Sequence, residues 1–159
     1  MIQSGKFDSF MNFKNNIEKI RNFLFKRLIE FLGVLLLISG FLILLSLISY
    51  NPNDPNFIYP SSQIIENLLG IRGSIVADFL FQSIGLVALF IPITLIFLSI
   101  SIIFEKKLVL IIKSLFFIIC YSIVGSIFFT QFYNEAFFLI INGNGGFIGN
   151  YFYNNIFFR

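Results

Sequence analysis

Residues 31–50 read FLGVLLLISGFLILLSLISY, a run of twenty residues without a charge, and residues 51–57 read NPNDPNF. A helix needs about 20 predominantly apolar residues to cross the hydrocarbon core of a membrane. Pro52 and Pro55 cannot continue a helix, and the Asn and Asp side chains around them can hydrogen-bond the freed backbone in turns. The stretch therefore predicts a membrane-spanning helix that ends abruptly in a polar loop.

The composition extends this interpretation to the whole chain of 159 residues. Hydrophobic residues make up 57% of it and charged residues 12%, whereas about 25% of the residues of a soluble domain are charged. The sequence therefore indicates an integral membrane protein. It contains no His and one Cys, Cys120. These counts exclude a disulfide within the chain, Cys/His zinc sites and the usual Ser–His and Cys–His nucleophile pairs.

Two further apolar runs are long enough to cross a membrane. Residues 74–104 contain one charge, Asp78, and residues 108–132 contain only Lys113. We expect an all-α membrane protein with three transmembrane helices, at 31–50, 74–104 and 108–132, and Pro92 should tilt or kink the second. The remaining segments are a basic cytoplasmic amphipathic segment (1–30), an external loop (51–73), a cytoplasmic turn (105–107) and an external Gly/Asn-rich tail (133–159) that is too polar to span.

The positive charges predict the orientation, because cytoplasmic segments are enriched in Lys and Arg. Six of the eleven Lys and Arg residues precede the first span, whereas the loop at 51–73 holds only Arg72 and the tail only Arg159. We therefore expect the N-terminus in the cytoplasm and the tail outside. The basic segment either lies on anionic lipid as an amphipathic helix or only sets this topology. Its candidate membrane-surface residues are Lys14, Lys19, Arg21, Lys26 and Arg27.

Two stretches carry a more specific pattern, LISYNPNDPNF (47–57) and NLLGIRGSIVADFLFQSIGLVALFIP (67–92). Together they resemble the N-terminal four-span membrane domain of the FtsK/SpoIIIE-type DNA translocases of bacteria. In that family the first span ends in S-Y-[DN]-P-x-D-P-x-[FW], and N-x-x-G-x-x-G-A-x-x-A-D introduces the second. Ser74 replaces the third small residue of this pattern, and NGNGGFIG (142–149) resembles the glycine stretch ahead of the family's fourth span. The resemblance assigns a structural or assembly role to Ser49, Tyr50, Pro52, Asp54, Pro55, Asn67, Gly70, Gly73, Asp78 and Gly85.

The resemblance implies a membrane anchor and assembly module of a cell-division DNA translocase, which couples chromosome segregation to septation. Such a protein lies in the bacterial inner membrane at the division septum, as a hexamer in contact with the bilayer and with septal division proteins. ATP and Mg belong to the family's motor, which these 159 residues lack together with the fourth span. We therefore expect a fragment or a piece of a split gene that has no enzymatic activity, no cofactor and no direct contact with nucleic acid.

Other functions remain open at the level of sequence. The chain could instead be a small multi-span transporter or a lipid-carrier flippase subunit, but such proteins generally carry paired polar groups at the bilayer midplane. A membrane enzyme is a third interpretation, and the absence of His and of a carboxylate cluster argues against it. The polar loop at 51–57 either only terminates the helix or also offers a contact surface to division proteins.

Asp78 has two interpretations. The first is a local role, in which Asp78 caps its helix together with Ser74 or pairs with Arg72. The second is a contact between helices or subunits, since acids inside a membrane are usually partnered. Small residues elsewhere in the spans predict close helix packing, at Gly85 and Ala88 and at Ser122 and Ser126.

Overall fold

The chain is all-helical in the part that the structure describes. The computed structural model describes residues 2–55, 64–133, 139 and 141–157, with side chains for these residues except 2–12, 156 and 157. The elements are α1 (Ile2–Ile48), α2 (Gly70–Ile84), the 3-10 helix η1 (Gly85–Leu89), α3 (Phe90–Glu105), α4 (Val109–Phe132) and α5 (Gly146–Phe157). Three stretches of these residues are long and apolar enough to cross a membrane, Phe13–Ile48, Gly70–Glu105 and Val109–Phe132. The predicted fold class is confirmed.

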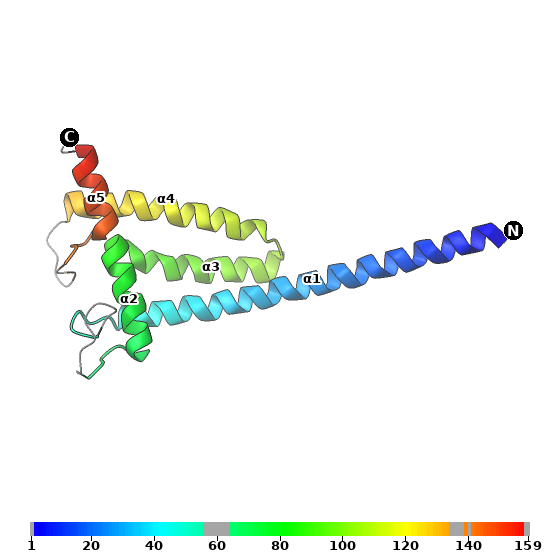
Figure 1. The fold of residues 1–159 in the computed structure, drawn as a ribbon, viewed down its shortest axis with the longest axis horizontal. Helices are drawn as coiled ribbons and strands as arrows, with labels where there is room; N and C mark the ends of the chain where they lie inside the picture. The colour runs from blue at the N-terminus through cyan, green and yellow to red at the C-terminus, as the bar shows by residue number, and fades with distance from the viewer. Residues whose placement is uncertain (1, 56–63, 134–138, 140, 158–159) are drawn as a thin grey trace.

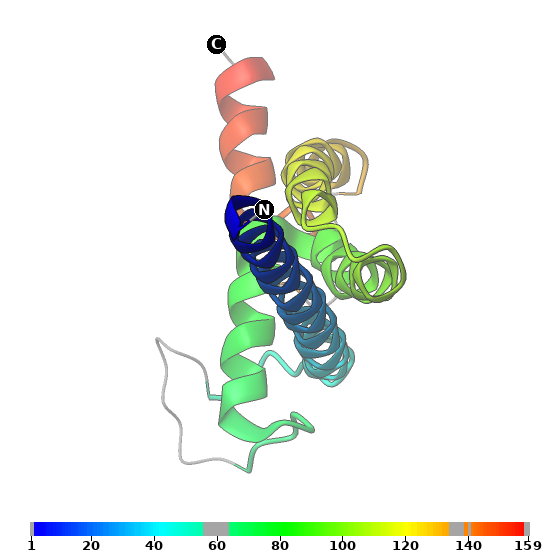
Figure 2. The ribbon, with the colours of Figure 1, turned by 90° about the vertical axis from the view of Figure 1, so that its right-hand side faces the viewer.

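Three long helices form the bundle, and two short helices lie across one end of it. α1, α3 and α4 run alongside one another, whereas α2 and α5 cross them (Figure 1). Seen along the bundle, α2 and α5 follow one line beside the three long helices (Figure 2). α3 contacts both α1 and α4 and so lies between them. We call the end that carries α2 and α5 the loop end, and the end where residues 106–108 join α3 to α4 the turn end.

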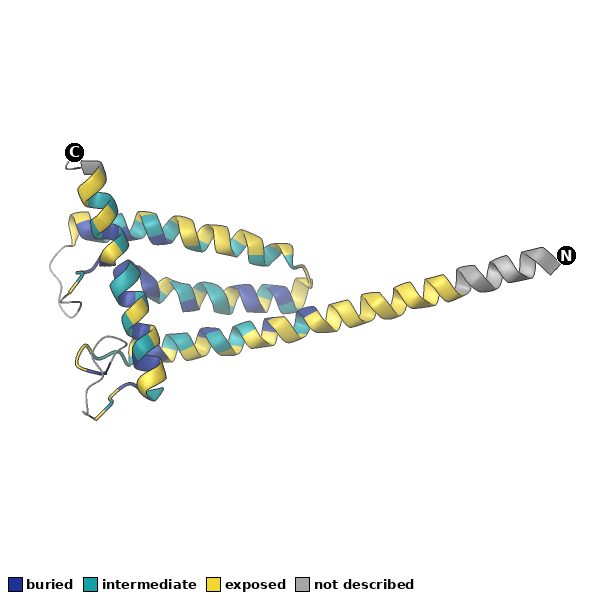
Figure 3. Ribbon diagram, viewed as in Figure 1, coloured by how far each residue is buried: buried dark blue, intermediate teal, exposed yellow. Residues whose placement is uncertain are grey.

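α1 continues as one helix far beyond the turn end. Residues 13–28 are all exposed, and burial begins at Ile29 (Figure 3). No Gly or Pro interrupts residues 13–32, and the Arg27 guanidinium pairs with the Glu30 carboxylate at 2.6 Å. The basic segment and the first span therefore form one continuous helix. The boundary between cytoplasm and membrane at residue 30 stays a prediction. The contact of the helix's Lys and Arg residues with anionic lipid also stays a prediction.

Small residues let α1 and α3 approach closely. Gly33 and Gly40 are both buried in this interface. A Cβ on Gly33 would lie 2.7 Å from Ile103 Cγ1, and one on Gly40 would lie 3.0 Å from Ile96 Cγ1. At the turn end the same two helices are joined by an ion pair of 2.5 Å between Lys106 and the Glu30 carboxylate. Small residues at a helix interface maximise the van der Waals contact that holds helices together in lipid.

The predicted second span at 74–104 is divided, because the helix breaks at Gly85. Gly85 has φ 66° and ψ −146°, a backbone conformation that essentially only glycine adopts. α2 therefore ends at Ile84 and crosses the bundle, and η1 and α3 turn to run along it (Figure 1). The change of direction between α2 and α3 therefore occurs at Gly85 and not at Pro92, where a kink was expected. Pro92 lies in the first turn of α3, where the missing N–H of proline has no helical partner to lose.

The third span agrees closely with its predicted limits, and the tail contains a short helix. α4 covers Val109–Phe132, close to the predicted 108–132, and Lys113 is exposed near its start. The tail was expected to be too polar and too rich in glycine to span, and residues Gly146–Phe157 within it form the short helix α5. Its 12 residues are too few to cross a bilayer, which takes about 20. The glycines precede the helix or lie on its packed face, and so they do not interrupt it.

Replacing Gly33 with Leu is expected to destabilise the α1–α3 contact. The new side chain would need the space that Ile103 and the Ser99 carbonyl occupy, and such overpacking typically costs about 1–3 kcal/mol. We expect a lower Tm of the purified protein in detergent. Val34→Leu, at an exposed neighbouring position, serves as the control and should leave Tm unchanged. Equal Tm values for the two variants would contradict close packing at Gly33.

Candidate functional site

The side chain of Asn67 joins the end of α1 to the start of α2. It is 4% exposed, and its Nδ2 donates hydrogen bonds to the carbonyl oxygens of Ser46 at 2.9 Å and Ser49 at 3.2 Å. Its Oδ1 accepts a hydrogen bond from the Leu69 N–H at 3.1 Å. The last carbonyls of a helix have no partner within the helix. Asn67 supplies one for the end of α1.

Asp54 holds the segment that leads into α2. Its carboxylate is 6% exposed, and it accepts the backbone N–H groups of Glu66 and Asn67, both at 2.9 Å. Hydrogen bonds to an ionised acceptor are stronger than neutral ones. Asn51 adds a bond of 2.6 Å from its Nδ2 to the Glu66 carboxylate. The polar loop is therefore bonded to the residues that precede α2.

Two serines attach the first turns of α2. Ser46 Oγ donates to the Gly73 carbonyl at 2.6 Å, and Ser74 Oγ donates to the Pro55 carbonyl at 2.8 Å. Gly73 is buried, and a Cβ there would overlap the carboxamide oxygen of Asn67. Ser74 is thus a buried attachment inside α2 and not the cap that was expected. We call Ser46, Ser49, Asp54, Asn67 and Gly73 the Asn67 node.

Asp78 and Tyr50 make a second contact between the loop and α2. The Tyr50 hydroxyl donates to Asp78 Oδ1 at 3.1 Å, and Gln82 Nε2 lies 3.5 Å from the same oxygen. The Tyr50 ring packs on Phe81 with centroids 4.9 Å apart. Burial, and then the charge of Asp78, raise the pKa of Tyr50 far above its usual value. The phenol therefore stays protonated and keeps its hydrogen bond to the carboxylate.

The expected ion pair between Asp78 and Arg72 does not form. Six residues along α2 place the two side chains about 120° apart around the helix. Among the described residues, Tyr50 and Gln82 are the hydrogen-bond partners of Asp78. Of the alternatives that the sequence left open for Asp78, the structure thus shows a contact between segments and not local capping.

Backbone contacts attach the tail to α2 and η1. The Leu86 N–H donates to the Asn144 carbonyl at 2.9 Å. A Cβ on Gly85 would overlap that carbonyl, and a Cβ on Gly146 would overlap the backbone of Gly85 and Ile84. The chain can approach this closely only because both positions are glycine.

α4 holds α5 through small residues at the same place. Ser126 Oγ donates to the Ile84 carbonyl at 2.9 Å, and Thr130 Oγ1 donates to the Ser126 carbonyl at 3.0 Å. Gly145 and Gly149 are buried, and a Cβ on either would overlap the Thr130 hydroxyl. We call the cluster of these residues the glycine node; its members are Gly85, Ser126, Thr130, Gly145, Gly146 and Gly149.

Asn142 bonds to α2 and to α5, where its carbonyl accepts a hydrogen bond from Asn150 Nδ2 at 2.8 Å. The Asn142 Nδ2 donates to the Gln82 side-chain oxygen at 3.0 Å and to the Gln82 carbonyl at 3.2 Å. Gln82 in turn lies beside Asp78. The loop end is therefore one connected polar layer that reaches from the end of α1 to α5.

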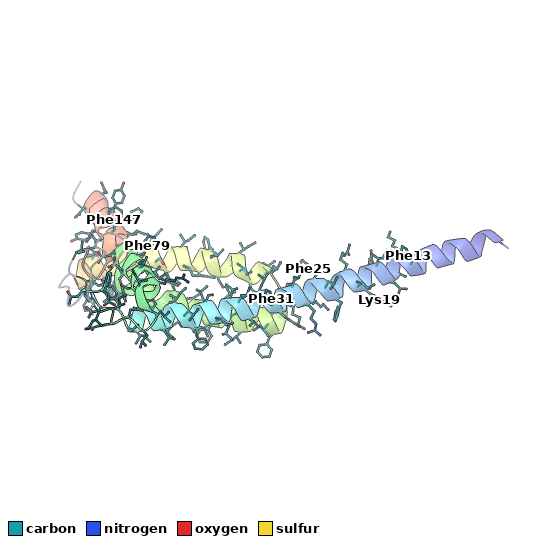
Figure 4. The ribbon with its side chains drawn as sticks, turned by 60° about the horizontal axis from the view of Figure 1, so that its bottom comes forward. Phe13, Lys19, Phe25, Phe31, Phe79 and Phe147 are labelled. Atoms are coloured by element: carbon teal, nitrogen blue, oxygen red, sulfur yellow. The ribbon has the colours of Figure 1, made fainter. Side chains whose placement is uncertain are left out.

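The structure brings most of the predicted assembly residues into this layer. Ser49, Asp54, Asn67 and Gly73 form the Asn67 node, Tyr50 and Asp78 bond to each other, and Gly85 belongs to the glycine node. Pro55 is buried beneath Ser74, Pro52 is exposed, and Gly70 begins α2 with φ 64° in open space. The basic residues of α1 lie beyond the turn end, far from this layer (Figure 4 marks Lys19).

Sequence reasoning missed several members of the polar layer. Ser46, Thr130, Asn142 and Asn144 were not singled out. A signal was present, because small polar residues recur where the apolar runs end. Ser126 was predicted to pack closely, and the structure confirms that it is buried against Ile84.

Replacing Asn67 with Ala is expected to lower the free energy of unfolding by about 1–3 kcal/mol, because buried backbone groups lose their partner. Thermal or denaturant unfolding of the purified protein measures this loss. Asn53→Ala is the matched control, since Asn53 is exposed and its side-chain carboxamide makes no hydrogen bond among the described residues. Equal stability of the two variants would show that the Asn67 amide does not hold α1 and α2 together.

Gly70 and Gly85 provide a second matched pair, since both have positive φ. Gly70→Ala should cost about 1–2 kcal/mol, from backbone strain alone. Gly85→Ala should cost clearly more, because the new Cβ also meets the Asn144 carbonyl. Unfolding of both variants under the same conditions tests the difference. A smaller loss for Gly85→Ala would contradict the close contact of η1 with the tail.

Comparison with known proteins identifies the family. Residues 25–156 match the model of the 4TM region of DNA translocase FtsK/SpoIIIE. The DNA translocase FtsK of Rickettsia typhi is 44% identical over 59 residues, which are 37% of this chain and 8% of that protein. The DNA translocase FtsK of Rickettsia prowazekii is 41% identical over 61 residues, 38% of this chain and 8% of that protein. No solved structure matches. The chain therefore belongs to the family of FtsK/SpoIIIE membrane regions and is a multi-pass membrane protein that corresponds to the anchor of a DNA translocase.

Proposed function

We propose that this chain anchors and assembles a cell-division DNA translocase at the septum of the bacterial inner membrane. The observation that carries the proposal is the family match over residues 25–156, within which the motif residues form the Asn67 node. ATP and Mg are bound by a motor outside these 159 residues. The chain itself performs no catalysis and makes no direct contact with DNA.

The shape of the molecule supports an anchoring role. α1 has 47 residues, which is about 70 Å of helix, more than twice the thickness of the hydrocarbon core. With the N-terminus in the cytoplasm, its basic part projects from the inner surface of the membrane. There it can interact with anionic lipid, which attracts Lys and Arg near the surface.

The loop end supports an assembly role. In the proposed orientation it lies on the outer side of the membrane, where septal division proteins have access to it. The described parts of its loop, residues 51–55 and 64–69, and the crossing helices are held by buried hydrogen bonds, so the surface that they present is fixed. A fixed surface binds a partner without the cost of ordering it first. Septal partners and further copies of the chain are the proposed ligands of this surface.

Fluorescence microscopy of dividing bacteria tests the proposal. A fluorescent protein fused to the N-terminus should give a band at the septum. The Asn67→Ala variant should lose the band or weaken it strongly, because the loop end loses its shape, and Asn53→Ala should retain it. An even distribution of the unaltered chain around the membrane would contradict the septal role. Specific solute flux through vesicles that contain only the purified chain would instead favour the transporter interpretation.

A further inference from the structure

We propose that a second copy of this chain docks on α2, so that Arg72 of one copy enters a groove beside Asp78 of the next. The inference rests on the proposed assembly function and specifies the surface that performs it. It follows from a charge of opposite sign on each flank of α2, a helix that lies across the bundle (Figure 2).

The acidic groove lies between α2 and α5. It encloses about 550 Å³, with apolar walls from Ile75, Phe79 and Phe147 and polar groups from Asp78, Gln82 and Asn142. Figure 4 marks Phe79 and Phe147 at the loop end. Both rings are largely exposed, at 69% and 59%. Such a groove suits a side chain with a long apolar stem and a charged head.

The carboxylate of Asp78 has a free oxygen in this groove. Tyr50 and Gln82 both approach Oδ1. Within the described part of the chain no hydrogen bond reaches Oδ2 and no cation lies within 4.0 Å of the carboxylate. Among the described residues, every buried side-chain nitrogen or oxygen atom has a hydrogen-bond partner. Because Oδ2 has no partner among them, it is not buried. Asp78 therefore offers one accessible acceptor and an unneutralised charge.

Arg72 lies on a different flank of α2, about 120° around the helix from Asp78. It borders a separate groove of about 270 Å³ that Leu42, Ile43, Leu69 and Val76 also line. Its side chain is exposed and has no carboxylate within salt-bridge distance among the described residues. Among the described residues, Arg72 is therefore an unpaired cation beside apolar surface. Its positive charge matches Asp78, and its apolar surroundings match the apolar walls of the acidic groove.

The two flanks generate a contact that repeats from copy to copy. α2 lies across the loop end, beside the three long helices (Figures 1 and 2). Copies inserted in one membrane with the same orientation all carry α2 at this end, and the proposed contact joins Arg72 of one copy to Asp78 of its neighbour there. The contact joins two different surfaces, the one around Arg72 and the groove beside Asp78, so it is head-to-tail. Such contacts close into a ring when the rotation between neighbouring copies returns to the first copy. An Arg–carboxylate pair also fixes the geometry of docking.

Charge reversal tests the contact in the full chain. Donor-labelled and acceptor-labelled chains are reconstituted in phosphatidylcholine vesicles, which contain no primary ammonium group that could occupy the groove. We expect Arg72→Glu or Asp78→Arg alone to weaken association, measured by energy transfer, by at least about tenfold. The double variant should recover most of the loss. Reversal of Arg21, which is exposed on α1, is the matched control and should change nothing.

Neutral variants show whether a loss of association comes from the lost charge and not from misfolding caused by charge reversal. Asp78→Asn keeps an oxygen that accepts the Tyr50 hydrogen bond, and Arg72→Gln keeps a polar head, so both should fold and both should weaken association. Unchanged association in these two variants overturns the proposal. So does a double reversal that inserts and folds but fails to recover. Association that appears only when phosphatidylethanolamine is added also overturns it, because the groove then binds a lipid ammonium group.

Cross-linking distinguishes a head-to-tail contact from a symmetric one. In a Cys120→Ser background that keeps Arg72 and Asp78, a chain with both Leu42→Cys, at the groove of Arg72, and Phe147→Cys, at the groove of Asp78, should form a ladder of multimers with a short bismaleimide. Either single cysteine should stay monomeric, because the groove of Arg72 meets the groove of Asp78 and not itself. Dimers from a single cysteine, or no ladder from the pair, contradict the proposal. Membrane insertion is measured by flotation. Chains that insert but do not associate refute only this contact. Chains that associate but do not localise to the septum refute only the septal role.

Discussion

The fold depends on how the chain satisfies its backbone hydrogen bonds where α1 ends. A helix leaves its last carbonyls without partners, and beside apolar surroundings such groups are expensive to leave unpaired. Asn67 bonds the carbonyls of Ser46 and Ser49, and Asp54 bonds the N–H groups ahead of α2. Because Asn67 immediately precedes the first turns of α2, satisfying α1 also fixes where α2 begins. The start of α2 follows from this one junction, and the break at Gly85 then sets the direction of α3.

The same solution occurs twice in the chain, with different chemistry. α2 begins at Gly70 and α5 at Gly146, both with positive φ, and both helices cross the bundle. Three residues further on, Gly73 and Gly149 are each too close to the preceding long helix or its loop for a Cβ. The first junction is held by carboxamide, carboxylate and hydroxyl side chains. The second is held mainly by direct contact of backbones, which is why glycine is concentrated in the tail.

Sequence reasoning identified the number of spans, the limits of α4 and most residues of the Asn67 node. It did not find that α2 crosses the bundle. Hydropathy measures how apolar a segment is but not its direction, so 74–104 read as one helix. The turn comes from a backbone conformation at Gly85, and its cause is a contact with Asn144, which is 59 positions away in sequence. Gly33 and Gly40 were overlooked for a similar reason, since their role depends on a partner helix that the local sequence does not specify.

The distribution of polar groups supports the proposal that the recognition surface lies at the loop end. Most of the outward surface of α1 and α4 is exposed aliphatic and aromatic side chains, and lipid tails compete equally well for such a surface. Within the bundle, Thr94 and Tyr121 bond to each other at 3.1 Å, so their hydroxyls already have a protein partner. α2 differs, because it carries Arg72 and Asp78 beside separate grooves, and no salt bridge reaches either of them among the described residues. The Asn67 node and Gly85 set the direction in which α2 crosses the bundle, so the residues that solve a folding problem also determine where these two charges lie.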